Sequence, residues 1–382
     1  MKKSPFTYGT TVSKESFTNR ESETERLYSN LTNGINTSII SPRRWGKSSL
    51  VEQVLLMVRQ RNPEIRTVAI DLFSIGAEEE FYEVFAKEVI KASSSKWQDW
   101  VESGRLFFKQ LLPKISFGID PMTDFSLEFD WEEVKKHPDE ILNLPEIIAE
   151  KSGKRFIICL DEFQNLANYS DFEDLEKKMR ASWQRQKKVT YCLYGSKRHM
   201  MMEIFNNSSK PFYRFGDLML LQKITQENWV SFIKGGFKST GKLIEEEEAA
   251  LIPKLMKCHS WYVQQLAHYT WQKTADKADK KVLNEALEEL IWTNTPLYQK
   301  EVESISNTQL NLLKAIVAGK KKFTSTKVMR DYKLGTPNNV TKNKAALIDA
   351  DIIHEFAGTF ELLDPAFELW FLKQFMDKDF SV

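Results

Sequence analysis

The chain has 382 residues, with 54 lysines and arginines against 53 aspartates and glutamates, so its formal net charge is +1. At roughly 100–200 residues per domain, this length predicts two or three domains. The 42% hydrophobic and 28% charged fractions exclude a disordered chain, and the near-neutral balance excludes a global attraction to nucleic acid or anionic lipid.

Strand-like and helix-like segments alternate through the first half of the chain. Apolar, β-rich runs predict strands at 36–40, 66–73, 155–160, 189–194 and 217–221. Helical spacing of apolar residues predicts helices at 48–61 and 78–92. This order predicts an α/β fold with a mainly parallel sheet and helices on both faces.

The rest of the chain falls into segments that differ in their pattern of apolar and polar residues. Alternating segments at 115–120 and 125–130 predict a hairpin inserted at about 113–131. Helical pattern begins near 223, and a final block of helices followed by a short alternating pair predicts a winged helix-turn-helix. We therefore expect three domains: 1–222, a helical lid over 223–303, and a winged helix over 304–382.

The cysteine count and the apolar runs indicate in which cellular compartment the protein works. Three cysteines without a CxxC pair do not make a disulfide framework, and the start MKKSPFTYGT has no apolar segment of the signal-peptide type. No stretch approaches the roughly 18 consecutive apolar residues that span a bilayer. We expect a cytoplasmic protein that does not enter a membrane.

A nine-residue turn follows the first strand and opens the first of these helices. It reads Ser41-Pro42-Arg43-Arg44-Trp45-Gly46-Lys47-Ser48-Ser49, in the strand–turn–helix context of a Walker A loop. Backbone N–H groups at a helix N-terminus attract phosphate, Gly46 permits close approach, Lys47 supplies charge, and Ser48 offers a hydroxyl to Mg²⁺. The motif's first glycine is replaced by Ser41, which would be strained if that position needed positive φ. The alternative is an ordinary basic helix cap.

The strand at 155–160 runs into Asp161-Glu162, the pattern of a Walker B motif. Asp161 would hold Mg²⁺ and Glu162 would polarise the attacking water. Carboxyl ends of parallel strands lie at one edge, so we expect both motifs to meet there. A charged strand end is the alternative interpretation.

Two further residues are candidates for contact with the γ-phosphate or the attacking water. Ser196 follows the strand at 189–194, and Arg214 could neutralise transition-state charge as arginine fingers do. A turn-capping serine and a surface arginine are the alternatives.

Together these motifs resemble the archaeal-type P-loop ATPases of the STAND-like branch of the AAA+/ASCE group. The matching boxes are Phe17-Thr-Asn-Arg20-Glu21, SPRRWGKSSL, Leu160-Asp-Glu-Phe-Gln164, Gly195-Ser196, Pro211-Phe-Tyr-Arg214 and Asp364-Pro365-Ala-Phe367-Glu-Leu-Trp370. The resemblance implies a sheet of order 5-1-4-3-2, a helical lid and a winged helix. It also implies that Phe17 and Arg20 lie near the adenine of ATP.

The chain departs from the family pattern at three places. The first Walker A glycine is absent, the lid's Gly-x-Pro stretch is not reproduced near Cys258-His259-Ser260, and the box ending at Arg214 lacks its glycine. We expect these departures to affect the rate of ATP turnover and the sensing of nucleotide by the lid more than they affect nucleotide binding.

Charge is concentrated in the final domain. Between Gln309 and Ile348 there are nine lysines and arginines and a single acid, Asp331. A basic second helix carrying Lys342 and Lys344 would contact DNA phosphates in the winged-helix manner. Docking of a protein and a merely solvated face are the alternatives.

We expect an ATP hydrolase, fast or slow, that depends on Mg²⁺ and works as a switch between arrangements of lid and winged helix. The alternatives are a DNA-binding winged-helix regulator and an ATP-dependent protein-interaction scaffold, each with slow or no hydrolysis. Expected partners are ATP and ADP, with DNA, a protein or a second copy as further candidates.

Overall fold

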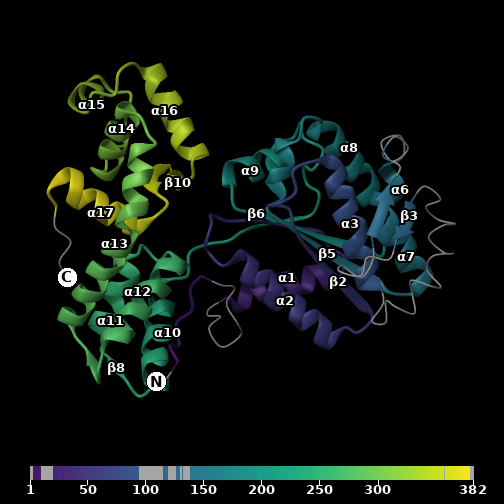
Figure 1. Ribbon diagram of the computed structural model, residues 1–382, viewed down its shortest axis with the longest axis horizontal. Helices are drawn as coiled ribbons and strands as arrows, with labels where there is room; N and C mark the ends of the chain where they lie inside the picture. The colour runs from purple at the N-terminus through teal and green to yellow at the C-terminus, as the bar shows by residue number, and fades with distance from the viewer. Residues whose placement is uncertain are drawn as a thin grey trace. The chain divides into compact units, whose positions relative to one another are not determined.

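The computed structural model describes residues 3–9, 20–93, 115–118, 126–129, 131, 138–356 and 358–378. The chain forms two compact units. One runs from Arg20 to Gln222, and the other combines Met1–Asn19 with Lys223–Val382 (Figure 1).

A five-stranded parallel sheet lies at the centre of the first unit. Its strands are β1 (Thr37–Ile40), β2 (Ile65–Asp71), β5 (Arg155–Asp161), β6 (Val189–Gly195) and β7 (Asp217–Leu220), in the order β2-β5-β6-β1-β7. Counted along the sheet's own strands this is 5-1-4-3-2, so the predicted fold class is confirmed. In the register, Ile40 lies opposite Gly195 and Asp71 opposite Asp161, which brings the carboxyl ends of the strands to one edge.

Helices cover both faces of this sheet. They are α1 (Glu21–Thr32), α2 (Lys47–Arg61), α3 (Glu78–Ser93), α6 (Pro138–Leu142), α7 (Leu144–Ser152), α8 (Phe172–Trp183), α9 (Arg198–Asn206) and the 3₁₀ helix η2 (Phe163–Asn168). Figure 1 shows α1 and α2 on one face and α3 and α8 on the other. The apolar runs of β5 and β6 are buried because both faces are covered, and Trp183 of α8 stacks on Tyr191 of β6 with ring centroids 4.1 Å apart.

A second, two-stranded sheet belongs to the segment between α3 and α6. Strands β3 (Ile115–Gly118) and β4 (Ser126–Phe129) pair antiparallel, as their alternating pattern predicted. The residues that join them lie outside the described part of the chain.

The second unit begins with a helical bundle, the lid. It contains α10 (Gln226–Ser239), α11 (Glu246–Leu255), α12 (Ser260–Lys273), α13 (Lys280–Glu303) and the short parallel pair β8 (Leu243–Ile244) and β9 (Lys277–Ala278). Residues 3–9 pack here and not on the sheet domain to which the sequence assigned them. Phe6 is buried in the lid core, and the Thr7 N–H donates to Gln264 Oε1 at 2.9 Å.

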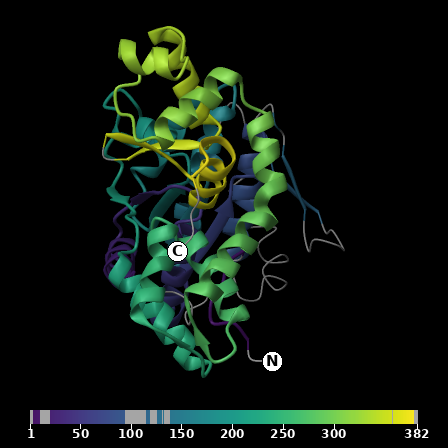
Figure 2. The ribbon, with the colours of Figure 1, turned by 90° about the vertical axis from the view of Figure 1, so that its left-hand side faces the viewer.

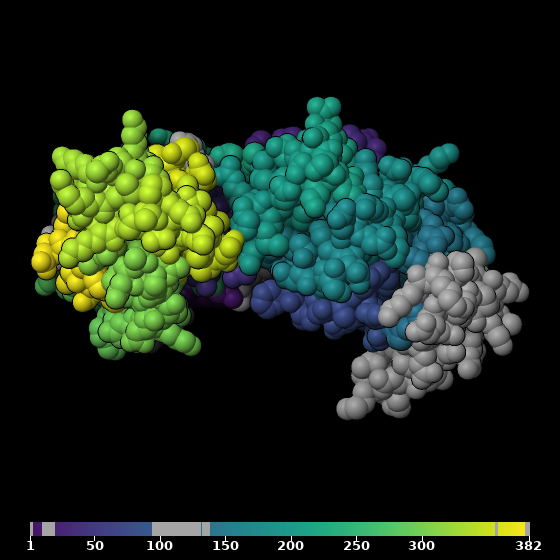
Figure 3. All heavy atoms as spheres, turned by 90° about the horizontal axis from the view of Figure 1, so that it is seen from above, coloured from purple at the N-terminus to yellow at the C-terminus, as the bar shows by residue number. Residues whose placement is uncertain are grey.

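The winged helix follows as α14 (Asn307–Val317), α15 (Thr326–Asp331), α16 (Pro337–Asp349), the antiparallel pair β10 (Ile353–Phe356) and β11 (Thr359–Leu362), and α17 (Pro365–Met376). Ser306, Ser325, Thr336 and Asp364 cap the helix N-termini with their side chains. Figure 2 shows the long α13 leading from the lid toward this domain, and Figure 3 shows the yellow-green atoms of the α15–α16 region at the surface of the winged helix.

Lid and winged helix share one hydrophobic core. Tyr298 of α13 lies 5.2 Å from Phe367 and 5.7 Å from Trp370 of α17, between ring centroids. Because one core holds both domains, they form a single body. Within the described ranges, no helix combines the length and apolarity that crossing a membrane requires.

Candidate functional site: a phosphate-binding turn at the sheet edge

The turn between β1 and α2 is built by two left-handed residues. Arg44 has φ +64° and Gly46 has φ +94°, and α2 begins at Lys47 directly after Gly46. Positive φ falls at these two positions and not at Ser41, so the strain expected from serine in place of the first glycine is absent. Ser41 is instead buried, and its N–H faces the carbonyl of Gly195 at 3.5 Å.

The N-terminus of α2 is open to an anion. It carries no side-chain cap and no acidic residue in its first turn, so no carboxylate of that turn competes for the positive end of the helix dipole. A Cβ built on Gly46 would meet no atom within 4 Å. The turn therefore has the open, N–H-lined form of a phosphate cradle.

The side chains of the two motifs meet at this edge, as the sequence predicted from strand order. Lys47 Nζ lies 3.0 Å from Glu162 Oε1, and the Ser48 hydroxyl donates to Asp161 Oδ2 at 2.8 Å. Lys47 is 6% exposed. A buried ammonium needs an anionic partner, and in this arrangement the carboxylate of Glu162 supplies it.

An ion pair and three hydrogen bonds hold the carboxylate of Glu162 in place. Its backbone is left-handed, with φ +51°. Its Oε2 accepts hydrogen bonds from Gln164 Nε2 at 2.6 Å, from the Ser196 hydroxyl at 2.8 Å and from the Ser196 N–H at 3.1 Å. The site thus unites Lys47, Glu162 and Ser196 from three separate segments.

Gln164 is a site residue that sequence reasoning missed, although it ends the Leu160–Gln164 box. Its side chain is buried at 1% exposure and lies against Gly195, where a Cβ would fall 1.9 Å from Gln164 Oε1. Gly195 is therefore needed to make room for the glutamine. The Gly195-Ser196 pair at the end of β6 was the signal available in the sequence.

The pKa values of Asp161 and Glu162 shift in opposite directions. Burial raises the pKa of Asp161 above its ordinary value, against the pull of the Lys47 charge and the Ser48 hydrogen bond. Burial acts on Glu162 in the same direction, but the Lys47 charge and the bonds from Gln164 and Ser196 outweigh it and lower this pKa. Adjacent carboxyls with opposite shifts are typical of sites that divide acid–base roles.

The remaining predicted nucleotide contacts line or brace the turn. Arg20 is buried, pairs with Glu23 at 2.7 Å and donates to the carbonyl of Trp45 at 3.3 Å. Arg43 is exposed and its Nε donates to the Ser196 hydroxyl at 3.3 Å. Other members of the turn are buried (Pro42, Trp45, Ser49) or exposed (Arg44), and Phe17 lies outside the described residues.

Arg214 does not join this cluster. It sits in a turn with φ +52°, its side chain is exposed, and its guanidinium carbon lies 5.2 Å from the ring centroid of Tyr213. The two lysines proposed for DNA differ from each other. Lys342 is exposed on α16, whereas Lys344 Nζ lies 4.6 Å from the ring centroid of Phe360 on the wing.

The donor set at this edge fits a magnesium ion. Ser48 and Asp161 offer hydroxyl and carboxylate oxygens, the hard ligands that Mg²⁺ prefers, and they already lie within hydrogen-bond distance. The donors and the open cradle are adjacent because Ser48 directly follows Lys47.

Comparison with known proteins agrees with this architecture. Residues 296–373 match the family described as a probable winged helix domain. No curated protein matches the sequence.

Solved structures resemble the chain over nearly its whole length. A Walker-type ATPase of Pyrococcus abyssi is 19% identical, with a TM-score of 0.64 over 94% of this chain and 97% of that one. The ORC2 protein of Aeropyrum pernix, solved as ADPNP–ADP complexes, is 13% identical, with a TM-score of 0.54 over 94% and 95%. The ORC1 protein of Aeropyrum pernix in complex with DNA is 12% identical, with a TM-score of 0.50 over 94% and 93%. The chain therefore has the fold of Walker-type ATPases with a C-terminal winged helix.

Proposed function

We propose that this protein binds ATP with Mg²⁺ and hydrolyses it, acting as a nucleotide-controlled switch. The observation that carries the proposal is the buried Lys47–Glu162 pair beneath an open, N–H-lined turn. A lysine held by a carboxylate beside a helix N-terminus without an acidic side chain in its first turn is arranged to exchange that carboxylate for phosphate.

In the proposed binding step, the phosphates of ATP occupy the turn from Ser41 to Ser49. Lys47 transfers its ion pair from Glu162 to phosphate oxygens, and N–H groups of the α2 terminus donate to them. Mg²⁺, held by Ser48 and Asp161, would neutralise developing charge on those oxygens. Phe17 and Arg20 would flank the adenine, since Arg20 braces the turn at Trp45.

In the proposed hydrolytic step, Glu162 accepts a hydrogen bond from the attacking water once Lys47 has left it. The hydrogen bonds from Gln164 and Ser196, which also lower its pKa, remain when Lys47 leaves, so they continue to favour the carboxylate form that polarises water. Ser196 and Gln164 fix the carboxylate, so that its position is set before water arrives. Ser196 then lies next to the reacting phosphate, and Arg214 would serve only after its turn or a neighbouring subunit brings it there.

The switch would act between the two units of the chain. Lid and winged helix share one core, so they would respond together to the nucleotide. The chain passes between the units at residues 19–20 and at residues 222–223, so these two junctions are where an arrangement would change.

The test is ATP turnover by the Glu162→Gln variant. We expect wild-type protein to release phosphate and the variant to lose about 10²–10⁴-fold in kcat, because general base assistance is worth that much, while ATP binding persists. The matched control is Glu173→Gln, at an exposed position of α8. This variant should hydrolyse ATP at the wild-type rate. Equal rates for Glu162→Gln and wild type would refute the catalytic assignment.

DNA binding is a second candidate, favoured by exposed Lys342 on α16 next to exposed Asn338 and Asn339 and by the DNA complex in which the ORC1 protein was solved. Polar and basic side chains on such a helix read and neutralise a duplex. A Lys342→Glu variant should weaken salt-dependent duplex binding, and Lys344→Glu should weaken it less because Lys344 already packs on Phe360. Absence of duplex binding at low salt would exclude this function.

A further inference from the structure

Helix α13 carries apolar side chains on two sides. Its inner side, with Leu287, Leu290 and Tyr298, is buried in the core that lid and winged helix share. Its outer side exposes Leu297 at 58% and Trp292 at 78%, and Trp292 is the most exposed large apolar side chain in the described part of the chain. Single exposed apolar residues are common on proteins, whereas a contiguous group of them marks a contact surface.

These two side chains belong to one continuous patch, which we call the α13 face. All of its members are exposed, and spacings of three and four residues link them, so they are neighbours on the helix surface. They are Glu289, Trp292, Thr293, Pro296, Leu297 and Lys300. The two charged members, the threonine and the proline follow the 4-3-4 spacing of a coiled-coil seam, and the two large apolar members flank that seam on opposite sides.

The order of residues along the α13 face makes it complementary to a second copy of itself. The six positions are symmetric about the midpoint between Asn294 and Thr295, with a carboxylate at one end and an ammonium at the other. When two copies run antiparallel about that midpoint, Glu289 of each copy faces Lys300 of the other. Opposite charges therefore meet at both ends of the contact.

The uncharged members fit the same arrangement. In an antiparallel pair, Thr293 of each copy faces Pro296 of the other, so only moderate-sized side chains lie between the two helices. The Trp292 side chains of the two copies meet along one flank, and the Leu297 side chains meet along the other. The pairing thus covers the two large apolar side chains that α13 exposes.

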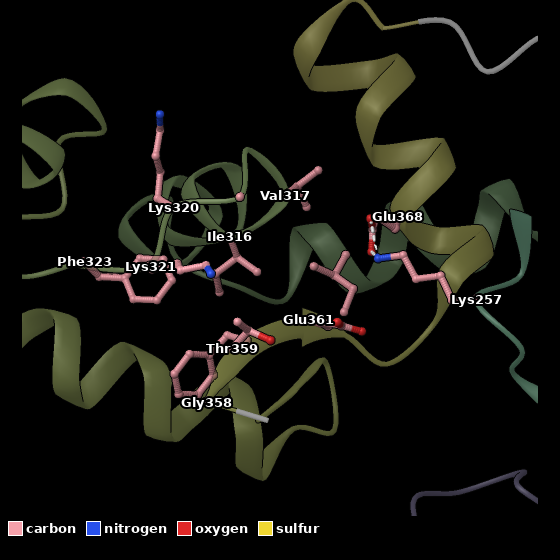
Figure 4. A pocket seen from close by; sticks show the side chains of 13 residues that line it. Lys257, Ile316, Val317, Lys320, Lys321, Phe323, Gly358, Thr359, Glu361 and Glu368 are labelled. Carbon is pink, nitrogen blue, oxygen red and sulfur yellow. Dashed lines mark hydrogen bonds and ion pairs between the residues drawn. The ribbon is translucent and has the colours of Figure 1, made fainter. Parts of the chain in front are cut away.

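The charges of the α13 face are available for this pairing. Lys300 is exposed and forms no ion pair within the described ranges, whereas Lys257 of the same unit has its Nζ 2.6 Å from Glu368 Oε2, as Figure 4 shows. Glu289 pairs with Lys273 through Oε2 at 2.7 Å, and its side chain remains 44% exposed. Its Oε1 is left for a second cation.

We infer that the α13 face is a self-association surface, which joins two copies of this chain through antiparallel α13 helices. Nucleic acid and anionic lipid do not fit it, because exposed Glu285 and Glu288 add their charges to that of Glu289 on this part of the helix. Six residues per copy are fewer than the roughly 20–30 that a standard interface uses on each side. The dimer is therefore weak and forms only as the protein concentration rises.

Sedimentation equilibrium of the full chain without nucleotide, over a series of concentrations, measures this association. We expect monomer and dimer with no larger species, since a two-fold contact closes on itself. Trp292→Ser should weaken the dimer roughly tenfold, because large aromatic side chains carry much of the affinity of an interface. Leu243→Ser, at an exposed leucine of β8, is the matched control and should leave the dimer unchanged.

Charge reversal tests the antiparallel register. Lys300→Glu places a carboxylate opposite Glu289 of the other copy and should weaken the dimer roughly tenfold. Adding Glu289→Lys to this variant restores opposite charges at both ends and should recover most of the lost affinity. Lys281→Glu is the matched control, because Lys281 is exposed on the same helix but lies outside the α13 face.

Four results would overturn the inference: a chain that stays monomeric at every concentration, equal weakening by Trp292→Ser and Leu243→Ser, a double reversal as weak as Lys300→Glu, or a Trp292→Ser variant that changes the compactness of the monomer instead of its association. The Lys47→Ala variant should dimerise like wild type. Failure of the ATPase proposal would therefore leave this result intact, and the reverse also holds.

Discussion

The turn at residues 41–49 and the basic face of the winged helix contrast in how their charges are partnered. At the turn, Lys47, Glu162 and Ser196 come from separate segments and form one buried network. On the winged helix, Lys320, Lys321 and Lys342 are exposed. A parallel sheet forces strand ends together, so motif spacing alone locates a site, whereas a count of lysines locates neither a face nor a partner.

The largest effect is expected from disturbing the buried network at its tightest point. A Gly195→Val substitution places side-chain atoms where a Cβ already falls 1.9 Å from Gln164 Oε1. Gln164 must move, Glu162 loses its bond from Gln164, and we expect overpacking to cost about 1–3 kcal/mol in the free energy of unfolding. Chemical denaturation and phosphate release measure the two effects, and an unchanged protein would show that the network is loose.

A smaller effect separates the network from Glu176, a buried acid of the same unit whose pKa shifts in the opposite direction to that of Glu162. Glu176 of α8 is fully buried, and burial raises its pKa to about 7 despite the nearby charge of Lys210. The folded state thus binds this proton more tightly than the unfolded state, so the free energy of unfolding falls as pH rises from about 4.5 to about 7. Glu176→Gln should remove about 2 kcal/mol of that dependence.

Denaturation at pH 5 and pH 8 checks this prediction. Asp174→Asn, at an exposed site of the same helix, is the control and should retain the wild-type pH dependence. If Glu176→Gln retains it too, the carboxyl is solvated and the contrast with Glu162 disappears.

The smallest effect is expected on the basic face. Lys344 Nζ lies over the ring of Phe360, and cation–π contacts at partly exposed sites contribute about 0.5–1 kcal/mol. Lys344→Ala should lower the free energy of unfolding by that amount, while Lys342→Ala, at an exposed position of α16, should change it by less than about 0.5 kcal/mol. Equal losses would mean that the wing contact has no energetic role.

The same contrast explains what the sequence could and could not predict. Lys47, Ser48, Asp161 and Glu162 were predictable because each follows a strand or opens a helix at a common sheet edge. The role of Gln164 was not, since it depends on the left-handed backbone of Glu162 and on the space at Gly195. Both arise from folding and leave no periodic pattern.

Contacts within the folded chain account for the other differences between the sequence-based predictions and the structure. The apolar residues near the N-terminus give no sign of their partner, yet Phe6 packs in the lid core. Arg214 ends the Pro211–Arg214 box, but its turn places its guanidinium over the ring of Tyr213. For Phe6 and Arg214 alike, the position of the side chain is set by a contact that forms only when the chain folds.

The central claim is that Lys47 exchanges Glu162 for the phosphates of ATP. Calorimetric titration of Mg²⁺–ATP into wild type, Lys47→Ala and the exposed control Lys91→Ala tests it most directly. We predict measurable heat of binding for wild type and Lys91→Ala and none for Lys47→Ala. Equal ATP affinity in wild type and Lys47→Ala would contradict the assignment of the nucleotide site.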